Sequence, residues 1–125
     1  EPADSVREES ATLIAVAHST GIEFYDATTY DIIPHNRPEL DNAFVFCVKF
    51  SPSANLVAVG LGDSSLYLYD TTSGFTPVAF DDSMFDARIN DIKFTADGSH
   101  MIVATHSLNQ SLFIFETTTW TQRKT

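Results

Sequence analysis

The sequence FSPSANLVAVGLGDSSLYLYDTT, residues 50–72, decides the fold of this 125-residue chain. It holds two short apolar runs rich in Val, Leu and Tyr, each bounded by Ser, Pro, Asn, Gly or Asp, which is typical of β-strands joined by tight turns. A second stretch, FTADGSHMIVATHSLNQSLFIFETT at residues 94–118, starts 44 residues later and follows the same order. The chain is therefore built from an internal repeat of strands and turns.

An earlier copy of the repeat lies at residues 13–28, LIAVAHSTGIEFYDAT. The three copies end on the acids Asp26, Asp70 and Glu116, which are 44 and 46 residues apart. We expect these carboxylates to accept hydrogen bonds from the N–H groups of the turns that follow them. No amphipathic pattern of helical length competes with the strands.

Each complete repeat has room for four strands. In the middle copy we expect an opening strand on the outer face (Val45 to Phe50), a fully buried strand (Leu56 to Gly60), a half-buried strand (Leu66 to Asp70) and a short fourth strand (Thr76 to Phe80). Four strands in every 44 to 46 residues is the size of one β-propeller blade. The fold class predicted is all-β, with about two and a half to three four-stranded antiparallel blades of a partial propeller.

The blade boundaries follow from the repeat. We expect an N-terminal tail at 1–10, a first blade at 11–35 without its opening strand, a second blade at 44–80 and a third at 88–122. Val6 is the only sizeable apolar residue of the first ten, so we do not expect this segment to supply the missing strand. Because a propeller closes with 4 to 8 blades, the open apolar faces predict further blades of a larger propeller, or association of copies as a homo-oligomer.

The repeats resemble those of WD-repeat and related YVTN-type β-propellers over residues 11–122. Residues 50–70 carry the best match, with the Phe-Ser-Pro turn, an apolar strand ending in Gly and an aromatic-Asp ending. The family's Trp is replaced by Tyr25, Tyr69 and Phe115, and its Gly-His dipeptide is missing. The family's buried hydrogen-bond set of His, Ser or Thr, Asp and Trp cannot be assembled from these residues.

A narrower similarity connects the chain with repeats of bacteriophage structural proteins. It is carried by AVAHST at residues 15–20, VATHS at residues 103–107 and ETTTWT at residues 116–121. This resemblance implies a structural role in a virion, in the tail or the capsid. The localisation stays open between a virion and the cytoplasm.

Charge and composition exclude several classes of function. Seventeen acidic residues against seven basic ones give a net charge of −10, and no basic stripe is present, so we expect neither nucleic acid nor an anionic membrane surface as a partner. Cys47 is the only cysteine and excludes an internal disulfide or a Cys-rich zinc site. We expect it to be a small buried hydrophobic residue of a strand.

Six residues are candidate contact residues: His18, His35, Arg37, Leu40, His106 and Trp120. His18 and His106 occupy the same place in two blades and could bind a metal or an acidic peptide, although we favour hydrogen bonds within their own hairpins. His35, Arg37 and Leu40, which looks exposed, lie on the long connection after the first blade, where a loop on a rigid scaffold can carry recognition. Trp120 should begin the last fourth strand, either packed on the outer face or free for a contact.

No catalytic motif is recognisable, and the acidic connection with Asp81, Asp82 and Asp86 lacks the spacing of a calcium loop. We therefore expect no cofactor, no metal and no enzymatic activity. The function predicted is a scaffold for protein–protein contacts. The alternatives are an intracellular WD-repeat adaptor subunit, or a propeller that binds a ligand or sugar through Tyr30, Phe75, Phe85 and Trp120.

Overall fold

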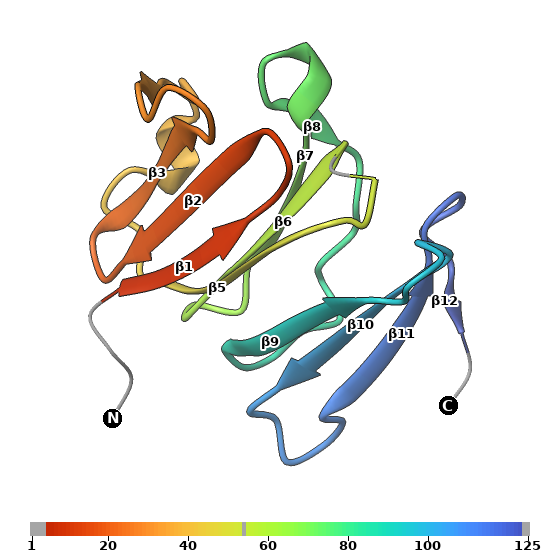
Figure 1. Ribbon diagram of the computed structural model, residues 1–125. Helices are drawn as coiled ribbons and strands as arrows, with labels where there is room; N and C mark the ends of the chain where they lie inside the picture. Colours follow the sequence, from red (N-terminus) through yellow and green to blue (C-terminus); the bar gives the residue numbers. More distant parts are fainter. Residues whose placement is uncertain (1–4, 54, 124–125) are drawn as a thin grey trace.

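The computed structural model describes residues 5–53 and 55–123 and contains three four-stranded antiparallel sheets (Figure 1). The first sheet holds β1 (Ser5–Glu9), β2 (Leu13–His18), β3 (Gly21–Asp26) and β4 (Ile32–Ile33). The second holds β5 (Val45–Phe50), β6 (Leu56–Leu61), β7 (Leu66–Asp70) and β8 (Thr76–Val78). The third holds β9 (Ile89–Phe94), β10 (His100–Thr105), β11 (Leu112–Glu116) and β12 (Gln122–Arg123). In each sheet, strands that follow one another in sequence are neighbours, so the all-β fold and the repeat are confirmed.

The first sheet is more complete than the sequence predicted. Residues 1–4 of the expected tail lie outside the described residues, but Ser5–Glu9 forms β1, which pairs with β2 from Ser5 opposite His18 to Glu9 opposite Ile14. The expectation that this segment adds no strand was wrong. Pairing at a sheet edge needs main-chain N–H and C=O groups, so the shortage of apolar side chains was a poor guide.

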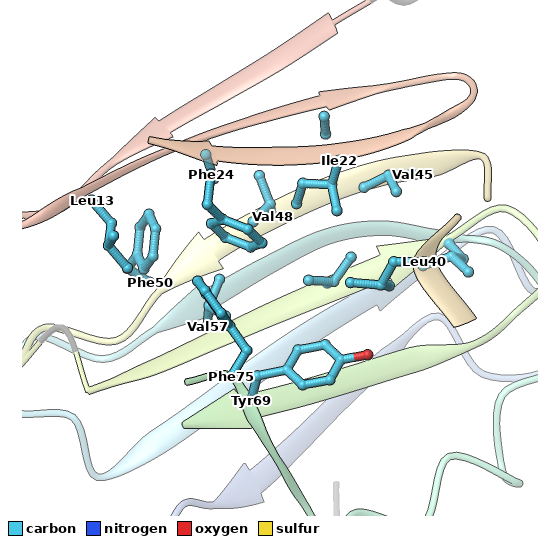
Figure 2. Close-up of a cluster of buried hydrophobic side chains, with 14 residues drawn as sticks. Leu13, Ile22, Phe24, Leu40, Val45, Val48, Phe50, Val57, Tyr69 and Phe75 are labelled. Carbon is cyan, nitrogen blue, oxygen red and sulfur yellow. The ribbon is translucent and has the colours of Figure 1, made fainter. Parts of the chain in front are cut away.

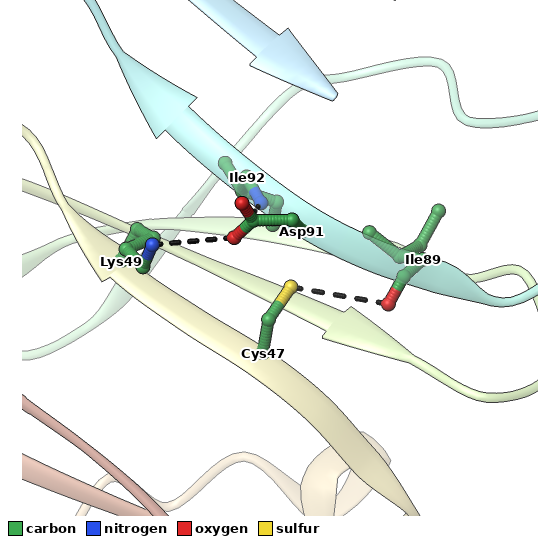
Figure 3. Close-up of polar contacts among 5 residues, drawn as sticks. All are labelled: Cys47, Lys49, Ile89, Asp91 and Ile92. Atoms are coloured by element: carbon green, nitrogen blue, oxygen red, sulfur yellow. Dashed lines mark hydrogen bonds and ion pairs between the residues drawn. The ribbon is translucent and has the colours of Figure 1, made fainter. Parts of the chain in front are cut away.

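The opening strands β1, β5 and β9 lie on the inner side of the arrangement, where the three sheets meet. β5 contacts both β1 and β9 (Figure 1), so its predicted place on an outer face was wrong. Lys49 Nζ lies 3.2 Å from Asp91 Oδ1. This ion pair, drawn in Figure 3, joins β5 to β9. Beside this pair the Cys47 thiol is buried and lies 3.9 Å from the Ile89 carbonyl, and burial raises its pKa to about 12.

Two apolar cores fill the spaces between neighbouring sheets. The first sheet packs on the second through Phe24, Val57 and Phe75, together with the ring of Tyr69 (Figure 2). The rings of Phe24 and Phe75 lie 4.4 Å apart, centroid to centroid. The second sheet packs on the third through a separate cluster, which includes Leu68, Ile92, Met101, Val103 and Phe115. Side chains alternate along the strands, so the second sheet contributes one face to each core.

The turns that close the repeats use the acids as predicted in two of three copies. Asp26 Oδ1 accepts hydrogen bonds from the N–H groups of Thr28 and Thr29 at 2.7 and 3.0 Å, and these bonds lower the pKa of Asp26. Asp70 Oδ1 accepts from the hydroxyl and N–H of Thr72 at 2.6 and 2.8 Å, with the same effect on its pKa, at the start of the 3-10 turn η2 (Thr71–Ser73). Glu116 makes no such side-chain bond within the part of the chain that the structure describes.

Candidate protein-contact surface

The connection between the first and second sheets is fastened to both of them. It contains the 3-10 turn η1 (Pro38–Leu40). Just before this turn, His35 Nδ1 accepts a hydrogen bond from the N–H of Arg37 at 2.9 Å, and the His35 ring lies edge-on to Phe24 of the first sheet. The Arg37 side chain donates from Nε to the carbonyl of Phe75 at 2.8 Å, beyond the end of β7. His35 and Arg37 are thus held in defined positions.

Leu40 is a core residue, which corrects its prediction as an exposed contact residue. Its side chain is 1% exposed and belongs to the core between the first and second sheets. Leu40 is the buried residue of the η1 turn, and Figure 2 shows it in the same cluster as Val45 and Tyr69. An isolated Leu among charged and Pro residues gives no periodic signal, so its burial could not be inferred from pattern.

Glu39, next to Leu40, accepts a hydrogen bond that sequence reasoning missed. The buried ring of Tyr69 reaches from β7 and donates its hydroxyl to Glu39 Oε2 at 2.6 Å. This bond is the main reason that the pKa of Glu39 lies below its ordinary value. The pKa of Tyr69 is raised, first by burial and then by the same bond. The pair ties the connection to the second sheet.

Replacing Tyr69 by Phe should cost about 1 kcal/mol of stability at neutral pH, the usual net value of one hydrogen bond. The bond lowers the pKa of Glu39 in the folded protein. The stabilisation that depends on the ionised Glu39 carboxylate is therefore fully present above the ordinary Glu pKa, and it is lost as the pH falls through the pKa of Glu39 in the folded protein. The measurement is urea unfolding of wild type and variant from about pH 7 to about pH 3. Tyr67→Phe on the same strand is the control, since Tyr67 donates no hydroxyl bond within the described residues. A stability gap that stays constant with pH would contradict the assignment.

Two hollows lie beside β3, next to its residues 21–24. The larger has a volume of about 480 Å³, and its lining includes Ile32, His35, Arg37 and Asp41. A neighbouring hollow of about 470 Å³ is lined by His18, Glu23 and Asp41 among others. The connection and the β2–β3 hairpin, separate in sequence, therefore form one surface. Four of the six predicted contact residues line its hollows (His18, His35, Arg37 and Leu40), although the Leu40 side chain is buried.

The larger hollow lies where β3 lacks a neighbour. β4 pairs only with Phe24 and Tyr25, so the preceding half of β3, which includes Ile22 and Glu23, has no strand on its outer side within the described residues. Ile22, Glu23 and Phe24 all line the hollow. An uncovered strand edge offers main-chain donors and acceptors to an incoming segment.

His18 and His106 are not brought together. His18 Nε2 lies 3.4 Å from Glu23 Oε1 in its own hairpin, and that carboxylate oxygen also accepts the Tyr25 hydroxyl at 3.0 Å. His106 is exposed on the third sheet, where its N–H donates to the carbonyl of Arg88 at 3.1 Å. No contact joins the two imidazoles within the described ranges, and within them no group of three or more His, Cys, Asp or Glu could hold a metal.

The four aromatic residues named for the alternative of ligand or sugar binding do not form an exposed cluster. Phe75 and Phe85 are core residues, and Trp120 is half-buried with its ring 5.8 Å from that of Phe80. Trp120 also precedes β12 instead of beginning it. Of the four rings, only Tyr30 is free, at 70% exposure. Three of the four aromatic residues that we considered for ligand binding therefore pack within the protein instead.

The acidic connection between the second and third sheets is used for local structure. Asp82 Oδ2 accepts from the N–H of Leu66 at 3.0 Å, Asp81 Oδ1 from the N–H of Ser83 at 3.0 Å, and Asp86 Oδ2 from the side chain of Asn109 at 3.0 Å. These bonds direct the carboxylates to separate partners. Among the described residues, no helix is long and apolar enough to span a membrane.

Comparison with known proteins agrees with this architecture. Residues 34–70, from the connection to the end of β7, match the family described as WD domain, G-beta repeat. The fold is similar to the crystal structure of the computationally designed Ika4 protein, with a TM-score of 0.69 and 11% sequence identity. That similarity covers 88% of this chain and 63% of the designed one, and at this identity it shows the fold alone.

No curated protein matches the chain. The similarity to bacteriophage structural proteins finds no support in these comparisons and stays a prediction. The chain is an all-β partial propeller in which residues 34–70 match a WD repeat.

Proposed function

We propose that this chain is a non-enzymatic scaffold that holds an extended segment of a protein partner in the larger hollow beside β3. The observation that carries the proposal is the hollow of about 480 Å³ at the uncovered edge of β3. A segment lying there could pair with the main chain of Ile22 and Glu23 as an added strand. The rigid sheets on either side would keep the site preformed, which reduces the ordering cost of binding.

The side chains around the hollow suit a peptide of mixed character. Ile32 supplies exposed apolar surface, while Glu23, Asp41 and Arg37 supply both signs of charge. Arg37 uses Nε for the Phe75 carbonyl, which orients the guanidinium and leaves its terminal N–H groups for a partner's carboxylate or carbonyl. Such a lining can bind a peptide through apolar and charged contacts, and it contains no nucleophile with an adjacent base.

The scaffold has two candidate biological settings. The resemblance to phage repeats favours a virion component, and the WD-repeat match at residues 34–70 is equally compatible with an adaptor subunit of an intracellular complex. Both settings use the same physical function, contact between a rigid propeller surface and another protein.

Site-directed photo-crosslinking tests the proposed site. A photoreactive amino acid replacing Asp41, exposed at the border of both hollows, should cross-link a protein partner in a lysate of the source organism. The same group replacing Leu108, fully exposed on the third sheet's hairpin, is the matched control and should not cross-link that partner. Ile32→Asp, combined with the probe at position 41, should abolish the specific product. Equal products from positions 41 and 108 would contradict the proposal.

A further inference from the structure

The first and third sheets each have one face that no other described residues cover. Strand register places Ile14, Val16, Glu23, Tyr25 and Ile32 on one side of the first sheet, which we call the first open face. These side chains are half-buried or exposed, whereas the opposite side of the same sheet is buried. In the third sheet, Ile102, Ala104, Leu112 and Ile114 form the second open face, and Leu112 is 46% exposed.

In the second sheet, the face equivalent to the first open face is covered by a neighbouring sheet. Val57, Val59 and Tyr69 face the first sheet and are buried in the core between the two. The repeat puts Ile14, Val16 and Tyr25 of the first open face at the same positions. The first open face therefore has the shape and apolar character of a surface that packs against a preceding sheet.

The second open face matches the other half of the same interface. Ala58, Leu66 and Leu68 of the second sheet are buried against the third sheet. Ile102, Leu112 and Ile114 occupy the same positions in the third sheet and have no following sheet within the described residues. One chain thus carries both halves of an interface that it already forms twice internally.

Tyr30 is the anchor of the first open face. Phe75 and Trp120 each lie in a left-handed turn before the last strand of their sheets, with φ of 62° and 57°. Each ring packs on the repeat before it, Phe75 on Phe24 and Trp120 on Phe80. Tyr30 has the same conformation, with φ of 63°, before β4, and its ring is 70% exposed.

We propose that the open faces are covered by a second copy of this chain, joined head to tail. Tyr30 of each copy then packs against the second open face of the other, near Leu112 and Ile114. Two such contacts close a ring of six sheets with two-fold symmetry, within the range of 4 to 8 blades in which propellers close. An exposed aromatic side chain that fills an apolar surface is the usual anchor of a protein interface.

Two polar residues make this interface weaker than the internal ones. His18 and Glu23 stand where the second sheet has Leu61 and Tyr67. Glu23 already accepts the Tyr25 hydroxyl and pairs with His18, so burial does not leave that carboxylate without partners. A reversible dimer that dissociates on dilution is therefore expected.

Light scattering after size exclusion, over a dilution series of the 125-residue chain, tests this proposal. Wild type should move from twice 13.8 kDa toward 13.8 kDa on dilution. The variants Tyr30→Asn and Leu112→Asp should each be folded monomers; Asn is chosen at position 30 because it tolerates the left-handed turn. An equimolar mixture of the two variants should regain dimer, because a mixed pair keeps one interface in which both Tyr30 and Leu112 are unaltered. Leu108→Asp, altered at a fully exposed residue of the loop between β10 and β11, is the matched control and should dimerise as wild type does.

Three results would overturn the proposal. Monomeric wild type at every concentration would mean that something other than a second copy covers the faces. Loss of dimer in Leu112→Asp but not in Tyr30→Asn would mean that two third sheets pack on each other. Masses that grow beyond the dimer would mean an open chain of copies. Circular dichroism on each peak separates these results from unfolding. The probe at position 41 lies outside both open faces, whereas Glu23 and Ile32 line the larger hollow and also belong to the first open face. The cross-link from position 41 without the Ile32→Asp change therefore tests the partner site separately, and Ile32→Asp is expected to weaken both contacts.

Discussion

Replacing Phe24 by Ala should lower the free energy of unfolding by about 3 to 5 kcal/mol, the usual loss for a buried Phe. Phe24 is fully buried between the first and second sheets, against Phe75 (Figure 2). The His35 ring lies edge-on to it. Truncation leaves a cavity that cannot collapse, because β3 is held by β2 on one side and β4 on the other. Urea unfolding followed by circular dichroism measures the loss.

Phe44→Ala is the matched control for this prediction. Phe44 is half exposed and its ring is tilted against that of Phe46, so truncation removes less buried area and leaves no closed cavity. Its effect should be less than half that of Phe24→Ala. Equal effects of the two substitutions would mean that the first and second sheets do not share a packed core.

Replacing Gly60 by Ala should cost about 1 to 3 kcal/mol through overpacking, although the change adds one methyl group to a strand. A Cβ at position 60 would lie 2.5 Å from Cγ2 of Ile89 and 2.9 Å from Sγ of Cys47. Both neighbours are buried where β6 approaches β9, so neither side chain can move aside. Thermal or urea unfolding detects the loss.

A double-mutant cycle identifies the cause of that loss. Ile89→Ala removes the nearest atom, so Gly60→Ala should cost less in the Ile89→Ala background than in wild type. Gly62→Ala is the comparison on the same chain segment, where the added Cβ meets the half-buried ring of Phe46 at 3.0 Å and the ring can shift. The same cost for Gly60→Ala in both backgrounds would contradict close packing of the second and third sheets at this point.

The repeat and its strands could be predicted from the sequence because they depend on local chemistry. β6 and β10 are runs of apolar residues between turn residues, and the carboxylates of Asp26 and Asp70 bond to turn N–H groups two or three residues away. The candidate surface was predicted only in part. His35 and Arg37 lie on a long connection, which is a recognisable feature, whereas the hydrogen bond of Glu39 with Tyr69 joins residues 30 apart and leaves no local signal.

The predictions that were wrong concern how strands and sheets pack against one another. β1 was missed because pairing at an edge depends on main-chain groups, and β5 was assigned to an outer face because alternation does not say which side a neighbouring sheet occupies. By itself the sequence determined an all-β chain of repeated four-stranded units, since strand and turn preferences act over a few residues. Only the tertiary structure decided that Leu40, Phe75 and Phe85 are buried and that Tyr30 is left exposed, because burial depends on packing between sheets that are distant in sequence.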